Sequence, residues 1–363
     1  MRIGLIGLGA AGRNHLAVLS RMPEVEVAGI ADLNASYVAD LQERFGVEHG
    51  TIDHRELLAD PSIEAIAIAA ADRAHYPLVL DCARAGKHVA CEKPIATEVA
   101  HGREMVAAMK AAGKLLCVTF NNRAGQVTRR IREVVQSGVI GNLRMVRLIG
   151  LMAAPDNGLL RQRMGAQAAY QRVLGICNDG KNAIFDCGVH SFDYARFLTG
   201  SEFARVEAMG YNLRGFQHPD HAVALCAMEN GVFVVIEKGF DYAFEAETYK
   251  EYVRYEVIGD EGSLAWDLDH QMLAVYARTT TFQEPLAQGG KEDVRETIYR
   301  GFVESVRAGE LQPWLASGLD GVKAIEAAQA AIDSAHAKGI VCRDIGPCRN
   351  WFEDDAEVAA TVT

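Results

Sequence analysis

The 363-residue chain lacks several features that would place it in other classes of protein. It has no apolar run of the roughly 18 residues that a membrane-spanning helix needs. Only a few apolar residues follow Arg2 before glycines and polar residues begin, so we expect no signal peptide. The eight cysteines include no C-x-x-C pair, so we expect neither a zinc site nor a disulfide framework. We therefore predict buried free thiols, no bound metal and a reducing compartment, the cytoplasm.

The chain also lacks an excess of positive charge. Its formal net charge is −11, which disfavours nucleic acid or an anionic membrane as a partner but still permits a local basic pocket. It contains no internal repeat of the kind that builds solenoids. What remains is an ordinary globular balance of 49% hydrophobic and 23% charged residues, and the length favours two domains.

The first third of the chain alternates apolar strand-like runs with helix-like stretches. The runs are almost wholly apolar, which is typical of parallel strands covered by helices on both faces. Residues 1–121 are therefore predicted to form a doubly wound Rossmann domain of the α/β class. The strand-like runs are residues 2–7, 25–32, 63–70, 87–91 and 114–120, and the helix-like stretches are 11–20, 35–45, 73–85 and 97–112.

The rhythm changes after about residue 120. A helix-like stretch (128–138), a long strand (142–153) and a polar segment (155–181) precede several strand-like runs separated by turn pairs. We predict that residues 122–345 form an α+β domain with a large open, mostly antiparallel sheet, and that the acidic tail 346–363 frays. The later strand-like runs are 204–215, 221–229, 231–240, 252–260, 262–268 and 271–277, followed by helices at 291–308 and 319–337.

A glycine-rich turn follows the first strand-like run. Gly7, Gly9 and Gly12 form G-x-G-x-x-G between a strand and a helix, and that context makes the pattern specific for a dinucleotide. In such a turn the first glycine permits the tight bend, the second lets the backbone approach the pyrophosphate, and the third lets the helix pack closely. We predict that the whole turn binds the cofactor, including Leu8, Ala10 and Ala11.

Asp32 ends the second strand-like run, where a carboxylate would bind the adenosine ribose 2′-hydroxyl. That carboxylate would repel a 2′-phosphate, and the next residues supply no cation, so we predict NAD rather than NADP. The alternative is that Asp32 only caps the next helix. The third long run ends in small residues followed by polar ones, and we predict cofactor contacts for Ala70, Ala71, Asp72 and His75, although His75 could equally be a helix-start residue.

Two further motifs appear, Glu92-Lys93-Pro94 after a strand-like run and Asp186-Cys187-Gly188-Val189-His190 in the second half. Together with the glycine turn, they resemble the glucose–fructose oxidoreductase/inositol dehydrogenase/rhizopine catabolism family over nearly the whole chain. The resemblance implies a Rossmann-like domain followed by an α/β domain, a tightly held nicotinamide cofactor that Glu92 and Lys93 contact, and sugar or cyclitol substrates. It also implies homodimers or homotetramers formed through the sheet.

The family's catalytic lysine, acid and histidine correspond to Lys93, Asp186 and His190, which also bind substrate. Residue chemistry agrees with these roles. Oxidation of a secondary alcohol needs a group that accepts the hydroxyl proton, and His190 can do so near neutral pH. Asp186 lies four residues earlier, on the same face if the segment is helical. Lys93 can stabilise alkoxide charge or relay the proton. We expect Asp193 to be structural.

The substrate side of the site is less well defined by sequence. Asn121 and Arg123 follow the last parallel strand, and Arg123 matches an arginine that the family often places near the substrate. The approach to the second motif departs from the family's glycine-rich pattern, so Lys181 and Asn182 are either substrate ligands or solvent-facing loop residues. Arg161, Arg163 and Arg172 either form a cationic patch for an anionic substrate or lie on a solvated helix face. The aromatic residues Tyr242, Phe244, Tyr249 and Tyr252 are predicted to pack between subunits rather than to rim the site.

We therefore predict an NAD-dependent dehydrogenase of a sugar, cyclitol or related polyol. One alternative is a glycosidase that oxidises a sugar hydroxyl transiently, eliminates the aglycone, adds water and reduces the ring again. Such an enzyme would release aglycone without accumulating NADH. The other alternative is a non-catalytic sensor that binds NAD and a partner protein, against which the intact Lys93, Asp186 and His190 argue.

Overall fold

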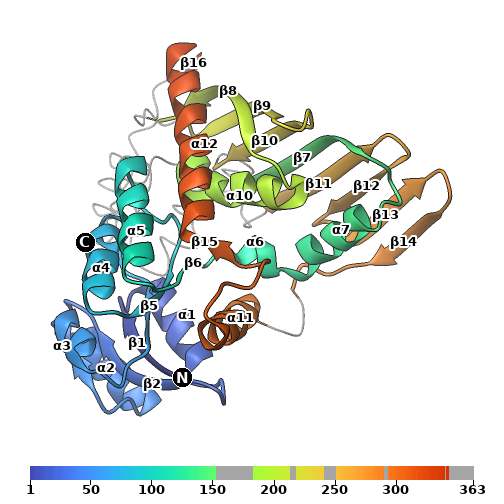
Figure 1. Ribbon diagram of the computed structural model, residues 1–363. Coiled ribbons are helices and arrows are strands. Elements are labelled where there is room, and N and C mark those ends of the chain that lie inside the picture. Colours follow the sequence, from blue (N-terminus) through green and yellow to red (C-terminus); the bar gives the residue numbers. More distant parts are fainter. Residues whose placement is uncertain (153–182, 213–217, 241–250, 290–292, 340, 343–363) are drawn as a thin grey trace, which may run out of the picture.

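The computed structural model describes residues 1–152, 183–212, 218–240, 251–289, 293–339 and 341–342. Within them the chain forms two β-sheets, one of seven strands and one of nine, with helices packed around and between them (Figure 1). No helix among these residues is both long and apolar enough to cross a membrane.

The first sheet confirms the predicted doubly wound domain. Its strand order is β15-β6-β5-β4-β1-β2-β3, and every neighbouring pair is parallel except β15 with β6. The strands are β1 (Arg2–Ile6), β2 (Glu26–Ala31), β3 (Gly50–Thr51), β4 (Ala65–Ile68), β5 (His88–Cys91), β6 (Leu116–Val118) and β15 (Ala316–Ser317). The helices that alternate with them are α1 (Ala10–Leu19), α2 (Ala35–Phe45), α3 (His54–Ala59), α4 (Asp72–Arg84) and α5 (Val99–Ala111).

The second sheet confirms the predicted open, mostly antiparallel architecture. Its order is β14-β13-β12-β11-β7-β10-β9-β8-β16, and only β7 with β10 and β8 with β16 run parallel. Its strands are β7 (Leu143–Met152), β8 (Phe203–Asn212), β9 (His221–Met228), β10 (Phe233–Gly239), β11 (Glu251–Gly259), β12 (Gly262–Asp267), β13 (Met272–Ala277), β14 (Thr281–Pro285) and β16 (Val341–Cys342). The helices of this half are α6 (Asn121–Ala124), α7 (Gln126–Gln136), the π-turn η2 (Ala183–Cys187), α10 (Gly188–Thr199), α11 (Val294–Ala308) and α12 (Gly318–Ala337).

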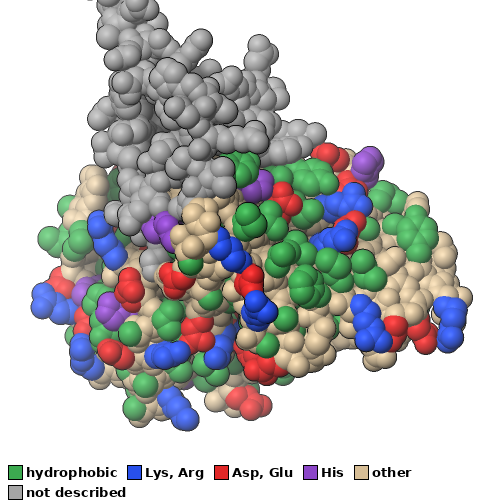
Figure 2. All heavy atoms as spheres, turned by 90° about the horizontal axis from the view of Figure 1, so that it is seen from above, with side chains coloured by type: hydrophobic (Ala, Val, Ile, Leu, Met, Phe, Trp, Pro, Cys, Tyr) green, Lys and Arg blue, Asp and Glu red, His purple; other side chains and the backbone are tan. Residues whose placement is uncertain are grey.

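The two faces of the second sheet differ. On β10, Val234 and Ile236 face the helices and are fully buried, whereas Phe233 on the opposite face is 44% exposed. Leu225 on β9 and Tyr276 on β13 also leave large hydrophobic side chains exposed. Viewed from above, the half of the molecule formed by this sheet shows hydrophobic side chains among charged ones (Figure 2). One face of the sheet thus belongs to the core and the other is open in the single chain.

The last helices connect the two sheets. Helix α12 packs against α5 on one side and against α10 and β8 on the other, and it rises between the two sheets in Figure 1. The strand just before it, β15, pairs antiparallel with β6 of the first sheet, through Ala316 with Val118. Buried side chains from both halves form one continuous core. This return fixes the carboxyl ends of the first sheet's strands beside η2 and α10.

Candidate active site

The glycine turn has the close backbone packing that its spacing predicts. Gly7 has a φ of 93°, a left-handed conformation that favours glycine, and a Cβ there would overlap the backbone of Ala69 and Ala70. A Cβ on Gly12 would overlap the carbonyl of Gly7. A Cβ on Gly9, by contrast, would meet nothing within 4 Å. Gly7 and Gly12 therefore shape the turn, whereas Gly9 keeps its outer side open.

The start of α1 is available to an anion. Gly9 is its N-cap and supplies no side-chain hydrogen bond to the first turn, and Ala10 and Ala11 are exposed. The helix therefore presents free N–H groups and the positive end of its dipole, which suit a phosphate. The side chain of Leu8 is fully buried, and its N–H donates to Oδ2 of Asp32 at 2.6 Å. The turn fits a dinucleotide on these grounds, and each individual cofactor contact stays a prediction.

The carboxyl end of β4 lies against the turn, where Ala69 and Ala70 pack on Gly7. Ala71 is the N-cap of α4, and Asp72 begins that helix. Burial raises the pKa of Asp72, and the nearby negative charge of Asp186 raises it further, whereas His75 and Lys93 lower it. The carboxyl group of Asp72 is thus in the same electrostatic environment as the second motif.

Both ring nitrogens of His75 have partners within the protein. Its ring is 0% exposed, with Nδ1 2.8 Å from the carbonyl oxygen of Pro94 and Nε2 3.1 Å from that of Ala70. The predicted contact of this ring with the cofactor stays a prediction. The ring connects the end of β4 to the loop that carries Lys93, which makes His75 a structural residue of the site.

Glu92 belongs to a buried network that the sequence did not reveal. One carboxylate oxygen lies 2.6 Å from Nε2 of His15, and the other accepts the N–H of Lys93 at 3.0 Å. The second ring nitrogen of His15 lies 2.7 Å from the hydroxyl of Tyr299 on α11. Burial alone would raise the pKa of Glu92, but the hydrogen bond and charge of His15 hold it at about 2. The carboxylate is therefore ionised and fixes the loop, and its contact with a cofactor stays a prediction.

Lys93 and Asp186 come together from the two halves of the chain, as the motifs predicted. Nζ of Lys93 donates to Oδ1 of Asp186 at 2.6 Å and to its carbonyl oxygen at 3.1 Å. The side chains are 21% and 26% exposed, so the pair remains accessible. Burial would lower the pKa of Lys93, but the charge and hydrogen bond of Asp186 outweigh it and raise the pKa. The amine is therefore a cation at neutral pH.

His190 lies beside this pair, at the start of α10, with its ring edge against Phe120 at a centroid distance of 5.6 Å. Burial, and then the positive charge of Lys93, lower the pKa of His190 to about 3. Among the residues that the structure describes, its buried Nδ1 has no hydrogen-bond partner. A neutral imidazole with an unused buried nitrogen leaves one polar contact for a ligand to complete.

Asn121 has a similar unused atom. It follows Phe120 directly, and its Oδ1 is buried without a hydrogen-bond partner. Native structures leave few buried polar atoms unpaired, so two of them near Phe120 indicate a place where a bound molecule supplies the missing partners. The predicted role of Asn121 in substrate binding is consistent with this placement and stays a prediction.

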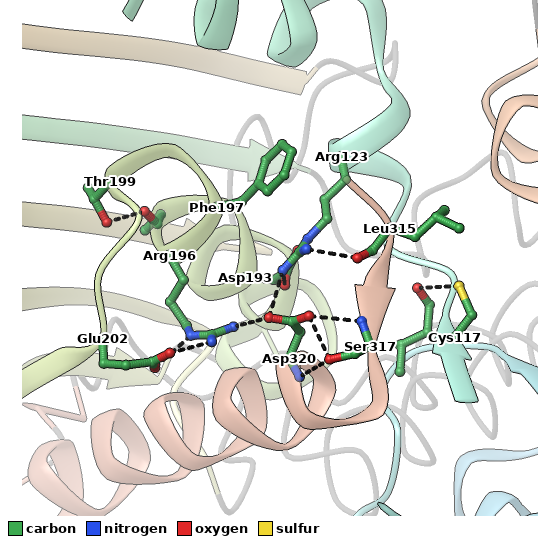
Figure 3. Close-up of polar contacts among 12 residues, drawn as sticks. Cys117, Arg123, Asp193, Arg196, Phe197, Thr199, Glu202, Leu315, Ser317 and Asp320 are labelled. Atoms are coloured by element: carbon green, nitrogen blue, oxygen red, sulfur yellow. Dashed lines mark hydrogen bonds and ion pairs between the residues drawn. The ribbon is translucent and has the colours of Figure 1, made fainter. Parts of the chain in front are cut away.

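Arg123, in contrast, directs its guanidinium to protein groups, and its predicted contact with substrate stays a prediction. Its side chain is 6% exposed, and it donates to both carboxylate oxygens of Asp193 at 2.8 and 2.6 Å and to the carbonyl oxygen of Leu315 at 3.2 Å. It also pairs with Asp320 at 3.1 Å (Figure 3). These protein groups already accept the hydrogen bonds that the guanidinium donates. The structural role predicted for Asp193, which is 0% exposed, is confirmed.

The remaining predictions on the substrate side concern residues outside the described part of the chain. These are Lys181, Asn182, Arg161, Arg163, Arg172, Tyr242, Phe244 and Tyr249. Tyr252 is described, on β11. The sequence analysis missed one basic group near the site, Lys238 on β10, whose positive charge also lowers the pKa of His190.

Comparison with known proteins agrees with this geometry. Residues 1–120 match the model of the Gfo/Idh/MocA oxidoreductase family with its NAD-binding Rossmann fold, and residues 128–265 match that family's C-terminal domain. An uncharacterised oxidoreductase of Bacillus subtilis, YrbE, is 30% identical over 342 residues, which cover 91% of this chain and 93% of that protein. A myo-inositol 2-dehydrogenase of Thermotoga maritima is 28% identical over 93% of this chain and 97% of its own.

Solved structures share the fold over the same span. A probable dehydrogenase of Thermotoga maritima superposes with a TM-score of 0.76 at 26% identity, covering 93% of this chain and 97% of that one. A levoglucosan dehydrogenase in complex with NADH and levoglucosan superposes with a TM-score of 0.77 at 23% identity, covering 93% and 98%. The chain therefore belongs to the Gfo/Idh/MocA family of oxidoreductases, with an NAD-binding Rossmann fold followed by the family's C-terminal domain.

Proposed function

We propose that this protein is an NAD-dependent dehydrogenase that oxidises a secondary alcohol of a sugar, cyclitol or related polyol. One observation carries the proposal. The Lys93–Asp186 ion pair joins the two halves of the molecule beside His190, whose buried Nδ1 lacks a partner. The relatives named for myo-inositol and levoglucosan support the class of substrate but not its identity at 28% and 27% identity.

The cofactor-binding half supplies two elements. NAD bound at the glycine turn would accept a hydride from the carbon that is oxidised. The start of α1 would hold the pyrophosphate, and Asp32 would bind the ribose 2′-hydroxyl. Asp32 already accepts the N–H groups of Leu8 and Asn34, at 2.6 and 2.8 Å, so its carboxylate is fixed in position. A fixed negative charge there favours NAD over NADP.

His190 is proposed to take the hydroxyl proton. Because the pKa of its imidazole is lowered to about 3, the ring is neutral at physiological pH and can accept a hydrogen bond from an alcohol. The imidazole is partly exposed, and it is the group assigned to that contact. The ring of Phe120, packed against the imidazole, limits how the imidazole can turn.

Lys93 is proposed to stabilise the negative charge that develops on the alcohol oxygen as its proton leaves. Asp186 keeps the lysine protonated and directs its amine, since it accepts from Nζ through both a carboxylate oxygen and its carbonyl. Asn121 would bind a neighbouring hydroxyl through its unpaired Oδ1. In this arrangement Lys93 acts on charge and His190 acts on the proton.

The open face of the second sheet supports a further proposal, that copies of the chain associate through it as a homodimer or homotetramer. Met209 is 64% exposed, Leu225 48% and Phe233 44%, and large exposed hydrophobic side chains on one sheet face are typical of an interface. Light scattering of the purified protein would reveal a single monomeric mass if this proposal is wrong.

A panel of polyols and glycosides tests the proposed function. Each compound is incubated with NAD or NADP, and NADH absorbance is recorded in parallel with chromatographic analysis of products. We expect stoichiometric NADH and ketone from at least one polyol, with NAD preferred. Release of aglycone without NADH would instead indicate the redox-neutral glycosidase, and no turnover of any compound would favour the NAD-binding sensor.

A further inference from the structure

Lys238 interrupts the buried side of β10. Ile236 and Val234, two and four residues before it, point to the helix-covered face of the sheet and are fully buried. Because side chains alternate along a strand, Lys238 points to that same face. It stands near the carboxyl end of the strand, where β10 contacts η2, the turn that carries Asp186. A lysine thus takes a core-facing position next to the candidate active site.

The neighbouring strands make room for this side chain. In the sheet register Lys238 lies between Gly150 on β7 and Ala222 on β9. Its Nζ lies over Gly150, so close that a Cβ on that glycine would overlap it. A small residue on either side lets the long side chain lie within the sheet's inner face rather than extend to solvent.

The side-chain amine of Lys238 has no hydrogen bond or ion pair in the part of the chain that the structure describes. Glu251 and the thiol of Cys187 act on it electrostatically and raise its pKa, but burial outweighs them and lowers it. The other lysine of the site, Lys93, is by contrast held by Asp186. A half-buried cation that faces inward without a neutralising partner is costly, so such a group usually has an anionic partner in the working state.

We infer that Lys238 binds an anionic group, a carboxylate or a phosphate, carried by the polyol substrate away from the carbon that is oxidised. The inference rests on the proposed function, since it concerns the substrate of the same site. Lys238 belongs to the second sheet and not to the glycine turn, so its assigned ligand is the substrate rather than the cofactor pyrophosphate. Lys93 is not available for this role because Asp186 already neutralises it.

Matched substrate pairs test the inference. Glucose is compared with glucuronate and with glucose 6-phosphate, and galactose with galacturonate, using wild type, Lys238→Met and Lys238→Arg. The ratio of kcat/KM for the acid over that for the neutral sugar should exceed about 10 in wild type, since a hydrogen bond to a charged group contributes about that factor. It should fall about tenfold in Lys238→Met and much less in Lys238→Arg. The uronate and phosphate arms show which anion is preferred.

Two further variants make the result specific. Gly150→Ala keeps the lysine but displaces its amine, so it should lower the same ratio. It provides the test if Lys238→Met does not fold. Lys110→Met removes an exposed lysine of α5 and should leave the ratio unchanged. A wild-type ratio of about one or less, or a ratio that is equal in wild type and Lys238→Met, would overturn the inference.

Binding separates this inference from the proposed function. The melting temperature of each protein with NAD is measured while glucuronate, glucose 6-phosphate or glucose is added. If no compound is oxidised, the proposed function fails, yet a stabilisation by either anion that Lys238→Met loses would still support an anion site. If neutral sugars are oxidised and neither anion stabilises wild type more than Lys238→Met, the inference fails alone.

Discussion

The molecule contains two cation–carboxylate pairs that look alike in sequence and differ in structure. Arg123 with Asp193 is 6% and 0% exposed, and Asp320 and the carbonyl of Leu315 take further donors of the guanidinium. Lys93 with Asp186 is 21% and 26% exposed, and the adjacent His190 has an unpaired buried nitrogen. The first pair has its hydrogen bonds satisfied within the protein. The second lies beside Nδ1 of His190, which has no hydrogen-bond partner among the described residues.

This difference separates scaffold from site. A satisfied, buried pair cannot bind a ligand without losing protein contacts, and breaking it leaves an uncompensated charge. An exposed pair beside an unpaired polar atom gains contacts when a ligand arrives. Figure 3 shows the scaffold case: Arg196 pairs with Glu202 and with Asp320, and Asp320 connects it to Arg123. The carboxylate of Asp320 also accepts the N–H of Ser317, the N-cap of α12.

The largest expected effect on stability comes from the satisfied pair. Arg123→Met leaves Asp193 buried without its cation and should lower the free energy of unfolding by about 3–5 kcal/mol. Urea unfolding followed by circular dichroism measures the loss. Arg103→Met, which breaks an exposed pair with Glu326, should cost at most about 1 kcal/mol. Equal losses in the two variants would remove the distinction between the pairs.

A fall in pH is expected to have an intermediate effect on the stability of the fold. The pKa of His190 is lowered from 6.5 to about 3 in the folded protein, so between these values the unfolded chain binds a proton that the folded one does not. Stability that His190 contributes above pH 6.5 is therefore lost as the pH falls toward 3. Melting curves over this range should fall more steeply for wild type than for His190→Gln. The exposed His270→Gln should follow wild type, and parallel curves for all three would contradict the expected burial of a neutral imidazole.

The smallest expected effect comes from the network that supports Lys93. Tyr299→Phe removes the hydroxyl 2.7 Å from Nδ1 of His15 and leaves that buried nitrogen unpaired. We expect a loss of about 1–3 kcal/mol in the free energy of unfolding. Tyr276→Phe, at a residue that is 50% exposed, should change it by less than about 0.5 kcal/mol. Calorimetry on both variants gives the comparison. A Tyr299→Phe variant as stable as wild type would show that the hydrogen bond to His15 does not stabilise the fold.

Much of the fold could be predicted from the sequence because long elements have clear periodicity. The apolar runs and helix-like stretches of the first third correspond to β1, β2, β4, β5 and β6 with their helices. The strands β3 and β15 have two residues each, too few for any pattern. β15 also lies far along the chain from its neighbour β6, since Ala316 pairs with Val118. The adjacent contact between Arg123 and Leu315 likewise spans 192 residues.

The site was only partly predictable, because contacts between residues far apart in the chain leave no local pattern in the sequence. The family resemblance assigned Lys93 and Asp186 to one site, and the structure brings the two side chains into contact although they are 93 residues apart. No local pattern shows that Asp193 and Leu315 converge on Arg123, or that two carbonyl oxygens enclose His75. Lys238 did have a signal, since a lysine continues the buried register of Val234 and Ile236.

The most direct test of the distinction between the two pairs is the initial rate of NADH formation by Lys93→Met, using the best substrate of the polyol panel. Loss of the cation should lower kcat/KM by about a hundredfold or more while the melting temperature stays close to that of wild type, because the pair is accessible rather than part of the core. A folded Lys93→Met enzyme that forms NADH at the wild-type rate would show that this pair is not the reactive site.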